Sequence, residues 1–260
     1  MIKRGEDKKY KKAQVTVFVI VAVLIIGLVI GLYFFRGNFN ILKENNPKGL
    51  SLEIGQVDSA FEDCLKQRAI DAIRIIGLQG GYITLPENYL VTSISNVAYG
   101  YYNGKKTLAT KETIEKEISS YIEASANYCI DYKDFSANIS VGKPSVKTKI
   151  ENDYVYVSTK IPISITKDNK VALLNRDYKV NVPIRLGNML DIANEIINRE
   201  IKEPDYVQLT YLSQLSFNTA IVPYTDESSV YFIIDKDNKT KIDNVPYTFM
   251  FANEIKWKIN

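Results

Sequence analysis

The chain contains no histidine and only two cysteines among its 260 residues. The absence of histidine excludes the Ser-His-Asp and Cys-His arrangements of nucleophilic enzymes. It also excludes the usual zinc sites, because two thiolates without a nitrogen ligand do not complete a tetrahedral site. Carboxylate pairs can act as acid and base, but most Asp and Glu residues lie in predicted turns or on polar helix faces. We therefore expect no catalytic, cofactor or metal site, and no enzyme.

Charge is absent from the 22 residues between Gln14 and Phe35. After Thr16, this stretch has no polar side chain until Tyr33. About 20 helical residues span the roughly 30 Å hydrocarbon layer of a bilayer, whereas a helix in a soluble core is usually shorter and has a polar face. The sequence therefore predicts a transmembrane helix over residues 14–35.

The predicted helix is long for the apolar core of a cleaved signal peptide, which has about 7–15 residues followed by small residues. Here the apolar run ends in Tyr33-Phe34-Phe35-Arg36, which favours a retained signal-anchor. Within the anchor, Gly27 and Gly31 form the G-x-x-x-G spacing that lets two membrane helices approach closely. Glycine is common in membrane helices for other reasons, so there are two hypotheses: the anchor associates with a second copy through this pair, or the pair has no role in association.

Basic residues are concentrated before the anchor. Residues 1–13 contain six basic and two acidic side chains, a net charge of +4, and the whole chain has +3, which leaves −1 for the rest. Because basic residues beside a membrane segment stay in the cytoplasm, we expect a cytoplasmic tail over 1–13 and a cell-membrane protein whose later residues are extracytoplasmic. A nearly neutral ectodomain binds polyanions poorly, which excludes nucleic acid as a partner.

The residues after the anchor divide into a linker and a folded domain. Residues 36–50 are rich in Gly, Asn and Pro with few apolar neighbours, which predicts a juxtamembrane linker. The remaining residues, 51–260, are expected to form one extracytoplasmic domain, although two smaller ones also fit its length. Helical and period-two patterns occur in mixed order, so the predicted fold is α+β, with antiparallel strands and amphipathic helices.

The predicted helices run from Val57 to about Gly77, from a Thr110 cap to about Cys129, from Met189 to Lys202, and from Asp205 to Leu215. The predicted strands cover 82–85, 93–102, 135–141, 145–150, 154–166, 171–184, 230–234 and 247–251. Turns are expected at Gly80-Gly81, Asn103-Gly104 and Asp168-Asn169. Pro162 and Pro183 fall inside predicted strands, which predicts that they lie at edges or bulges.

The two cysteines, Cys64 and Cys129, each lie on the apolar face of a predicted helix. In an oxidising compartment they can form a disulfide that closes a long loop. The alternative is a pair of separate buried thiols that behave as small hydrophobic side chains. We expect the disulfide.

Two features suggest contacts outside the cell. Asn138-Ile-Ser140 and Asn238-Lys-Thr240 match the N-glycosylation motif, which is short and common by chance. Tyr99, Tyr101 and Tyr102 form a cluster that can contact a protein or a glycan, or can simply be half-buried in a strand.

The residues Lys11-Lys12-Ala13-Gln14 and the apolar run after them resemble the class III leader of archaeal type IV pilin-like precursors. That resemblance implies cleavage between Ala13 and Gln14. Ala13 and Phe18 stand where pilins commonly have Gly and Glu, and Gly37-Asn38 interrupts the helix that pilins continue into their head domain.

Most of the remaining chain is similar to uncharacterised archaeal single-pass membrane proteins with an external domain. The similarity rests on Cys64-Leu65, on the run from Gly77 to Ile83, and on the run from Tyr247 to Ala252. It implies no known activity. We therefore expect an anchored cell-surface structural or binding protein with a protein or glycan partner. The alternative is a pilin-like subunit that is processed before Gln14 and assembles into a filament.

Overall fold

The computed structural model describes residues 48–131, 134–203, 209–235 and 240–254. The chain divides into two compact units between Gly49 and Leu50, and the second unit, Leu50–Asn260, holds almost all of the described residues. Within the described ranges, no helix combines the length and apolar character needed to cross a membrane. The predicted anchor, its Gly27 and Gly31 pair and the Ala13-Gln14 processing site lie outside these ranges.

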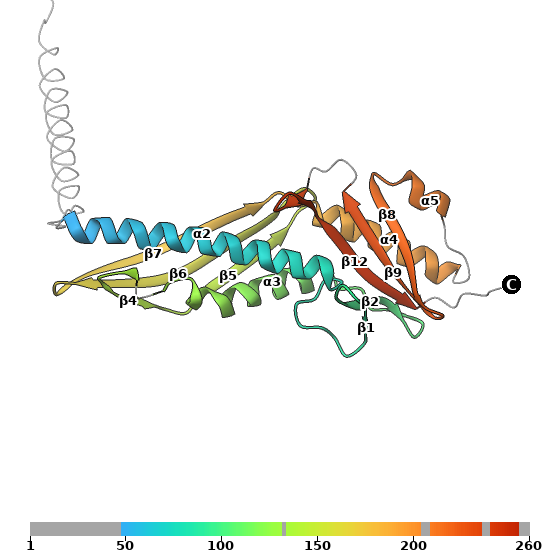
Figure 1. Ribbon diagram of the computed structural model, residues 1–260, viewed down its shortest axis with the longest axis horizontal. Helices are drawn as coiled ribbons and strands as arrows, with labels where there is room; N and C mark the ends of the chain where they lie inside the picture. Colours follow the sequence, from blue (N-terminus) through green and yellow to red (C-terminus); the bar gives the residue numbers. More distant parts are fainter. Residues whose placement is uncertain (1–47, 132–133, 204–208, 236–239, 255–260) are drawn as a thin grey trace, which may run out of the picture. The chain divides into compact units, whose positions relative to one another are not determined.

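The longest element is helix α2, Lys48–Leu78 (Figure 1). It begins well before the predicted start at Val57, and its first three residues belong to the predicted linker. A single glycine, Gly55, does not stop the helix, because glycine inside a helix costs only about 1 kcal/mol relative to alanine. One stripe of side chains is fully buried, as the spacing predicts: Val57, Phe61, Leu65, Ala69, Ala72, Ile73 and Ile76.

The C-terminal end of α2 is closed by the predicted glycine turn. The backbone N–H of Gly81 donates to the carbonyl of Ile76 over 2.9 Å, and Gly80 has φ +72°. This is the six-to-one hydrogen bond of a Schellman motif, which requires a residue in the left-handed conformation. The predicted strand at Tyr82–Leu85 is wrong, because these residues form no strand. The N–H groups of Ile83 and Thr84 instead donate to the Glu117 carboxylate, each over 3.0 Å.

The first sheet is antiparallel and is built from consecutive strands. Its members are β4 (Asn138–Val141), β5 (Ser145–Ile150), β6 (Val155–Lys167) and β7 (Lys170–Val182). Strands β4 and β5 pair one after the other along the same side of β6, and β7 pairs along its other side over thirteen residues. The turn residues Asp168 and Asn169 have φ of 49° and 61°, which confirms the predicted hairpin.

Pro162 lies in β6, the central strand of this sheet, and not at an edge as predicted. The sheet tolerates it because the neighbouring edge is interrupted there, between the end of β4 and the start of β5. At the interruption the N–H of Gly142 donates to the carbonyl of Pro162 over 2.8 Å. Pro183 follows the last residue of β7.

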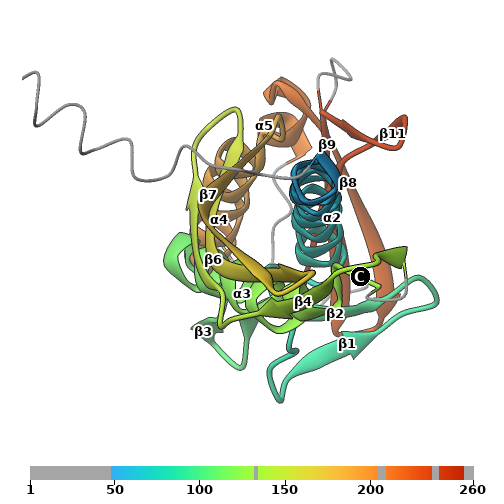
Figure 2. The same ribbon diagram turned by 90° about the vertical axis from the view of Figure 1, so that its left-hand side faces the viewer.

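Helices α2 and α3 (Lys111–Ser125) cover this sheet. The rings of Phe61 on α2 and Tyr178 on β7 stack at 6.3 Å, and Figure 2 shows the sheet curving around one side of α2. Helix α3 lies along β5, where Glu115 and Glu123 accept hydrogen bonds from the edge N–H groups of Ile150 and Val146. Thr110 caps α3 through the N–H of Thr113, as predicted.

The second sheet combines strands from distant parts of the sequence, in the order β1-β2-β12-β9-β8. Strands β2 and β12 are parallel and the other pairs are antiparallel. Its members are β1 (Tyr89–Val91), β2 (Asn96–Tyr102) with the short β3 (Lys105–Lys106), β8 (Phe217–Thr225), β9 (Ser228–Asp235) and β12 (Thr248–Glu254). Asn103 and Gly104 have positive φ, as predicted for the β2–β3 turn.

Both faces of this sheet are covered at its central strands β12 and β9. On β12, Phe249 and Phe251 belong to the main core, while Met250 and Ala252 belong to a second cluster with Leu90. Helix α4 (Leu186–Lys202) contacts β12, and the short α5 (Leu209–Gln214) contacts β8. A small hairpin, β10 (Lys241–Ile242) and β11 (Val245–Pro246), precedes β12. The sequence prediction missed β1, β8 and this hairpin, but the α+β class with mainly antiparallel strands is confirmed.

Candidate interaction surface

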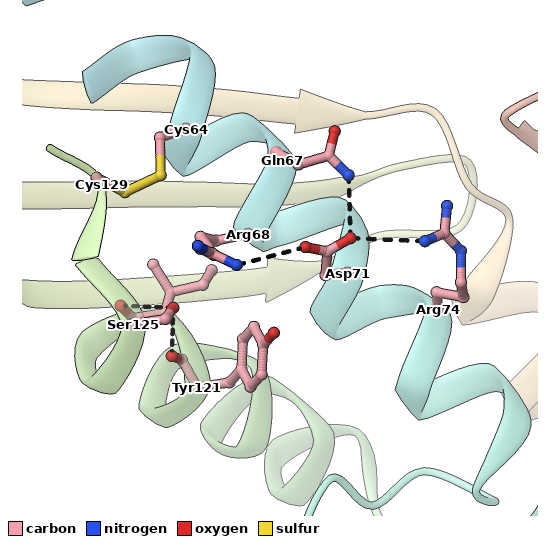
Figure 3. A network of polar contacts seen from close by, with 9 residues as sticks. Cys64, Gln67, Arg68, Asp71, Arg74, Tyr121, Ser125 and Cys129 are labelled. Carbon is pink, nitrogen blue, oxygen red and sulfur yellow. Dashed lines mark hydrogen bonds and ion pairs between the residues drawn. A yellow bond between two sulfur atoms is a disulfide. The ribbon is translucent and has the colours of Figure 1, made fainter. Parts of the chain in front are cut away.

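The cysteines form a disulfide, as the sequence predicts. Cys64 lies in α2, and Cys129 follows the short 3-10 helix η1 (Ala126–Tyr128), with 5.5 Å between the two Cα atoms (Figure 3). The bond joins two segments 65 residues apart and fixes the end of α3 against the middle of α2. Both cysteines are half-buried, and the bond between them links α2 to the segment that follows α3.

A polar network follows the disulfide along α2 (Figure 3). Asp71 accepts a hydrogen bond from Gln67 over 3.0 Å and forms ion pairs with Arg68 at 3.8 Å and Arg74 at 3.5 Å. Arg74 also pairs with Asp243 in the turn between β10 and β11. Because Asp71 already faces two guanidinium groups, it is held as their counter-ion, which does not suit it to act as a general base.

Two shallow grooves are present in the described part of the domain. One, of about 380 Å³, lies between the end of α2 and the β10–β11 hairpin, with Leu78, Val245 and Tyr247 in its mainly apolar lining. The other, of about 300 Å³, lies between α5 and β8 and is lined by Leu212, Phe217 and their neighbours. Polar side chains also line both grooves: Arg74, Asp243 and Thr248 in the first, and Ser213, Asn218 and Thr219 in the second.

Glu200 is a buried carboxylate that has no basic side chain beside it in the described part of the chain. Glu200 on α4 accepts hydrogen bonds from the Tyr231 hydroxyl on β9 and from the Asn253 amide on β12. Burial raises the pKa of Glu200, and the two hydrogen bonds oppose that rise only in part. Burial also raises the pKa of Tyr231, so its hydroxyl stays protonated. The cluster is enclosed in the core and joins α4 to the second sheet.

Two further carboxylates are held by basic groups between elements. Asp235, at the end of β9, pairs with Arg185 at 3.2 Å and accepts from Thr240. Glu53 on α2 pairs with Lys167 at 2.6 Å, and this hydrogen bond is the main reason that the pKa of Glu53 is lowered. Across the described residues, no group of three His, Cys, Asp or Glu side chains is placed to hold a metal ion.

The most open surface is the side of the first sheet that faces away from α2. Along β6 and β7, residues alternate between buried and exposed, so one face belongs to the core and the other to solvent. We call the solvent side the outer sheet face. Its outward residues are Asn138, Ser140, Ser145, Lys147, Lys149, Tyr156, Ser158, Lys160, Pro162, Ser164, Thr166, Val171, Leu173, Asn175, Asp177, Lys179 and Asn181.

The outer sheet face has an apolar end and a basic end. Val171 and Leu173, opposite Thr166 and Ser164, are 61% and 77% exposed near the β6–β7 turn. Lysines gather toward the other end, where Lys147 and Lys179 both neighbour Ser158. The exposed apolar side chains beside basic ones on one face make this side of the sheet the candidate interaction surface.

The other predicted sites have separate positions. Asn138 is exposed at the start of β4, so its motif is accessible on the outer sheet face, while Asn238 lies outside the described residues. The rings of Tyr99 and Tyr102 contact each other at a tilt of 41°, with centroids 4.7 Å apart, and the Tyr99 hydroxyl is hydrogen-bonded to that of Ser228. The tyrosine cluster is thus partly used for packing in the second sheet.

The chain was compared with protein-family models, curated proteins and solved structures. No family model, no curated protein and no solved structure matches it.

The outer sheet face was not identified from the sequence, because its identification requires the strand register. The signal was present in the lysines of β5 and β7: Lys179 lies between the buried Tyr178 and Val180, and Lys147 follows the buried Val146.

Proposed function

We propose that the protein is a single-pass membrane protein of the cell surface, anchored by residues 14–35. In this proposal residues 1–13 are cytoplasmic, and the α+β domain lies outside the cell, where it acts as a structural or binding module without catalysis. The observation that carries the proposal is the 22-residue stretch without charge that follows a tail of net charge +4. Its length fits a bilayer and the charge on its N-terminal side sets the orientation.

The disulfide supports an extracytoplasmic position for the domain. Disulfides persist in oxidising compartments and are rare where thiols are kept reduced. Cys64 and Cys129 are the only cysteines of the chain, and both take part in the bond. A contact with a protein or glycan partner outside the cell is part of this proposal, and the exposed Asn138 motif fits an extracytoplasmic position.

A second candidate function is that of a pilin-like subunit, processed before Gln14 and assembled into a filament. It is favoured by the sequence Lys11-Lys12-Ala13-Gln14 directly before the apolar stretch. In that case the same stretch leaves the bilayer and packs against other copies. We place it second because Gly37 and Asn38 are expected to interrupt the helix that a filament core requires.

The test is to extract isolated membranes with alkaline carbonate and to determine the mass and N-terminal sequence of the retained protein. Retention with a start at or near Met1 is the expected result and supports the signal-anchor. A start at Gln14 supports the pilin-like alternative, and filaments are then sought. Release of a protein that begins beyond residue 35 contradicts both, because it shows a cleaved signal peptide.

A further inference from the structure

We propose that the outer sheet face lies on the anionic headgroups of the membrane that holds the anchor. This inference rests on the proposed anchor at residues 14–35 and adds a second, peripheral contact to it. Three observations carry it: the place of this face in the chain, the exposed apolar side chains at one end, and the lysines toward the other.

The position of the first sheet in the chain keeps it within reach of the membrane. Only twelve residues, 36–47, separate the apolar stretch from the first described residue of α2, so full extension allows about 45 Å. The ion pair between Lys167 and Glu53, at 2.6 Å, holds the β6–β7 turn against the beginning of α2 (Figure 1). The apolar end of the outer sheet face is therefore at the end of the domain where the linker enters.

The apolar end exposes two large aliphatic side chains that contribute nothing to the core. Val171 and Leu173 point away from α2, while their neighbours Ala172 and Leu174 pack against the core cluster. Moving a side chain of this size from water to an apolar environment is favoured by about tenfold or more in the equilibrium constant, so both side chains favour an apolar contact. The interface of a bilayer provides that environment directly beside the anchor.

The basic end carries lysines whose charge is available to an anion. Among the described residues, Lys147, Lys160 and Lys179 are exposed on the outer sheet face and are in no ion pair with N···O of 4.0 Å or less. The acidic residue of this face, Asp177, lies opposite Lys160 and accepts a hydrogen bond from the Ser158 hydroxyl. Residues 138–182 contain eight basic and four acidic side chains, a net +4, although the chain after the anchor has a net charge of −1. Within the part of the chain that follows the anchor, the positive charge is therefore concentrated in the first sheet.

The combination favours a bilayer over other anionic partners. A soluble polyanion uses the lysines but leaves Val171 and Leu173 in water, whereas an anionic bilayer accommodates both kinds of side chain. A lysine close to such a surface strengthens binding by about fivefold, and the attraction decays over about 10 Å at 0.1 M salt. Lys147 and Lys179 lie on either side of Ser158, and Lys160 is two residues further along the same face, so one surface can lie close to all three.

The test uses the full chain in vesicles, with one introduced thiol as a probe site. Both native cysteines are disulfide-bonded, so Leu173→Cys creates the single reactive thiol for a fluorophore. The matched control is Leu209→Cys, on α5, because Leu209 is similarly exposed but lies away from the outer sheet face. Each labelled chain is reconstituted in phosphatidylcholine with phosphatidylglycerol, or in phosphatidylcholine alone, with quencher lipids in both.

We expect the probe at position 173 to be quenched several times more strongly than the probe at 209, and only with phosphatidylglycerol. Combining Leu173→Cys with Lys147→Glu, Lys160→Glu and Lys179→Glu should reduce this quenching to the control value. Because Lys160→Glu would place a second carboxylate opposite Asp177 in the sheet, the neutral set Lys147→Gln, Lys160→Gln and Lys179→Gln is measured beside it. The neutral set should also lower the quenching and should unfold at an unchanged temperature. High salt should have the same effect as the charge reversal.

The outcomes separate this inference from the proposed function. A chain that does not float with the vesicles after a carbonate wash contradicts the anchor itself. A chain that floats, with equal quenching at positions 173 and 209, overturns the membrane contact and leaves the anchor standing. Energy transfer between two labelled copies at position 173, without lipid quenching, also overturns it, because a second copy then covers the face.

Discussion

The two sheets of this domain bury their side chains in different ways. In the first sheet, β6 alternates between buried, mainly aliphatic residues and half-buried or exposed ones, so one face is core and the other faces solvent. In the second sheet, five consecutive residues of β12 are buried, because a hydrophobic cluster lies on each face. The first sheet thus keeps a surface that can meet a partner, while the second serves as the interior of the domain.

This contrast explains which elements the sequence could predict. Period-two alternation predicts a half-buried strand, and all four strands of the first sheet lie close to their predicted positions. The connections in that sheet are local, so its hairpin tip at Asp168-Asn169 could also be predicted. Its outer face could not, because residues from β4 to β7 join into one surface only when their register is known.

The second sheet was only partly predictable, for three physical reasons. Strand β8 is an edge strand that exposes most of its residues and contains Pro223, so it lacks an apolar pattern. The parallel pairing of β2 with β12 joins Tyr99 to Ala252, a separation in sequence that no local signal spans. The cluster of Glu200, Tyr231 and Asn253 likewise depends on three elements that meet only in the fold.

The sharpest test of the contrast is to replace adjacent residues by alanine in both sheets. In β12, Phe251→Ala should cost about 3–5 kcal/mol and its neighbour Met250→Ala about 2–5 kcal/mol, because both side chains are buried. In β6, Ile163→Ala should cost about 2–5 kcal/mol, but its half-exposed neighbour Ser164→Ala less than about 0.5 kcal/mol. The measurement is the free energy of unfolding in urea. A large loss of unfolding free energy in Ser164→Ala would show that both faces of the first sheet are buried, as they are at β12 in the second sheet.

Loss of the disulfide should affect the packing of the helices that cover the first sheet. Replacing Cys64 and Cys129 by alanine removes a bridge between residues 65 apart, which is worth about 4 kcal/mol in the chain-entropy model. For a domain of this size, such a loss lowers the unfolding temperature by about 10 °C. Calorimetry measures it, and hydrogen exchange should increase first in α3 and the neighbouring β5. A loss below about 1 kcal/mol would show that the bridge is dispensable.

Two glycines of α2 lie in different surroundings: Gly77 is packed closely against the second sheet, and Gly55 is on an open side of the helix. A Cβ at Gly77 would lie 2.4 Å from the Thr248 carbonyl of β12, so Gly77→Ala should destabilise the domain by about 1–3 kcal/mol. Gly55→Ala is the matched control, since nothing lies within 4 Å of its Cβ position. It should stabilise the helix by about 0.5–1 kcal/mol. Equal effects in thermal unfolding would argue against the close approach of α2 and β12.

The smallest expected effects are opposite pH dependences at Glu200 and Glu53. Glu200, against the second sheet, has a raised pKa through burial, so its contribution is greatest below the unfolded pKa of about 4.3 and is lost as pH rises through its folded pKa. Glu53 has a lowered pKa through Lys167, so its contribution is present above about pH 4.3 and is lost as pH falls through its folded pKa.

Urea unfolding at a series of pH values tests both directions with conservative variants. Glu200→Gln should remove the fall in stability on the alkaline side of pH 4.3, and Glu53→Gln should remove the fall on its acid side. The two variants act as controls for each other, because each leaves the other carboxylate in place. The same pH profile for both variants would contradict the assigned environments.

The most direct test of the anchored, extracytoplasmic domain is thiol labelling of intact cells with a membrane-impermeant maleimide. The two native cysteines are bonded to each other, so Leu209→Cys and Gly5→Cys each provide one reactive thiol in an otherwise unreactive chain. We predict that position 209 is labelled in intact cells and that position 5 is labelled only after the membrane is permeabilised. Labelling of position 5 in intact cells, with position 209 protected until permeabilisation, would contradict the proposed topology.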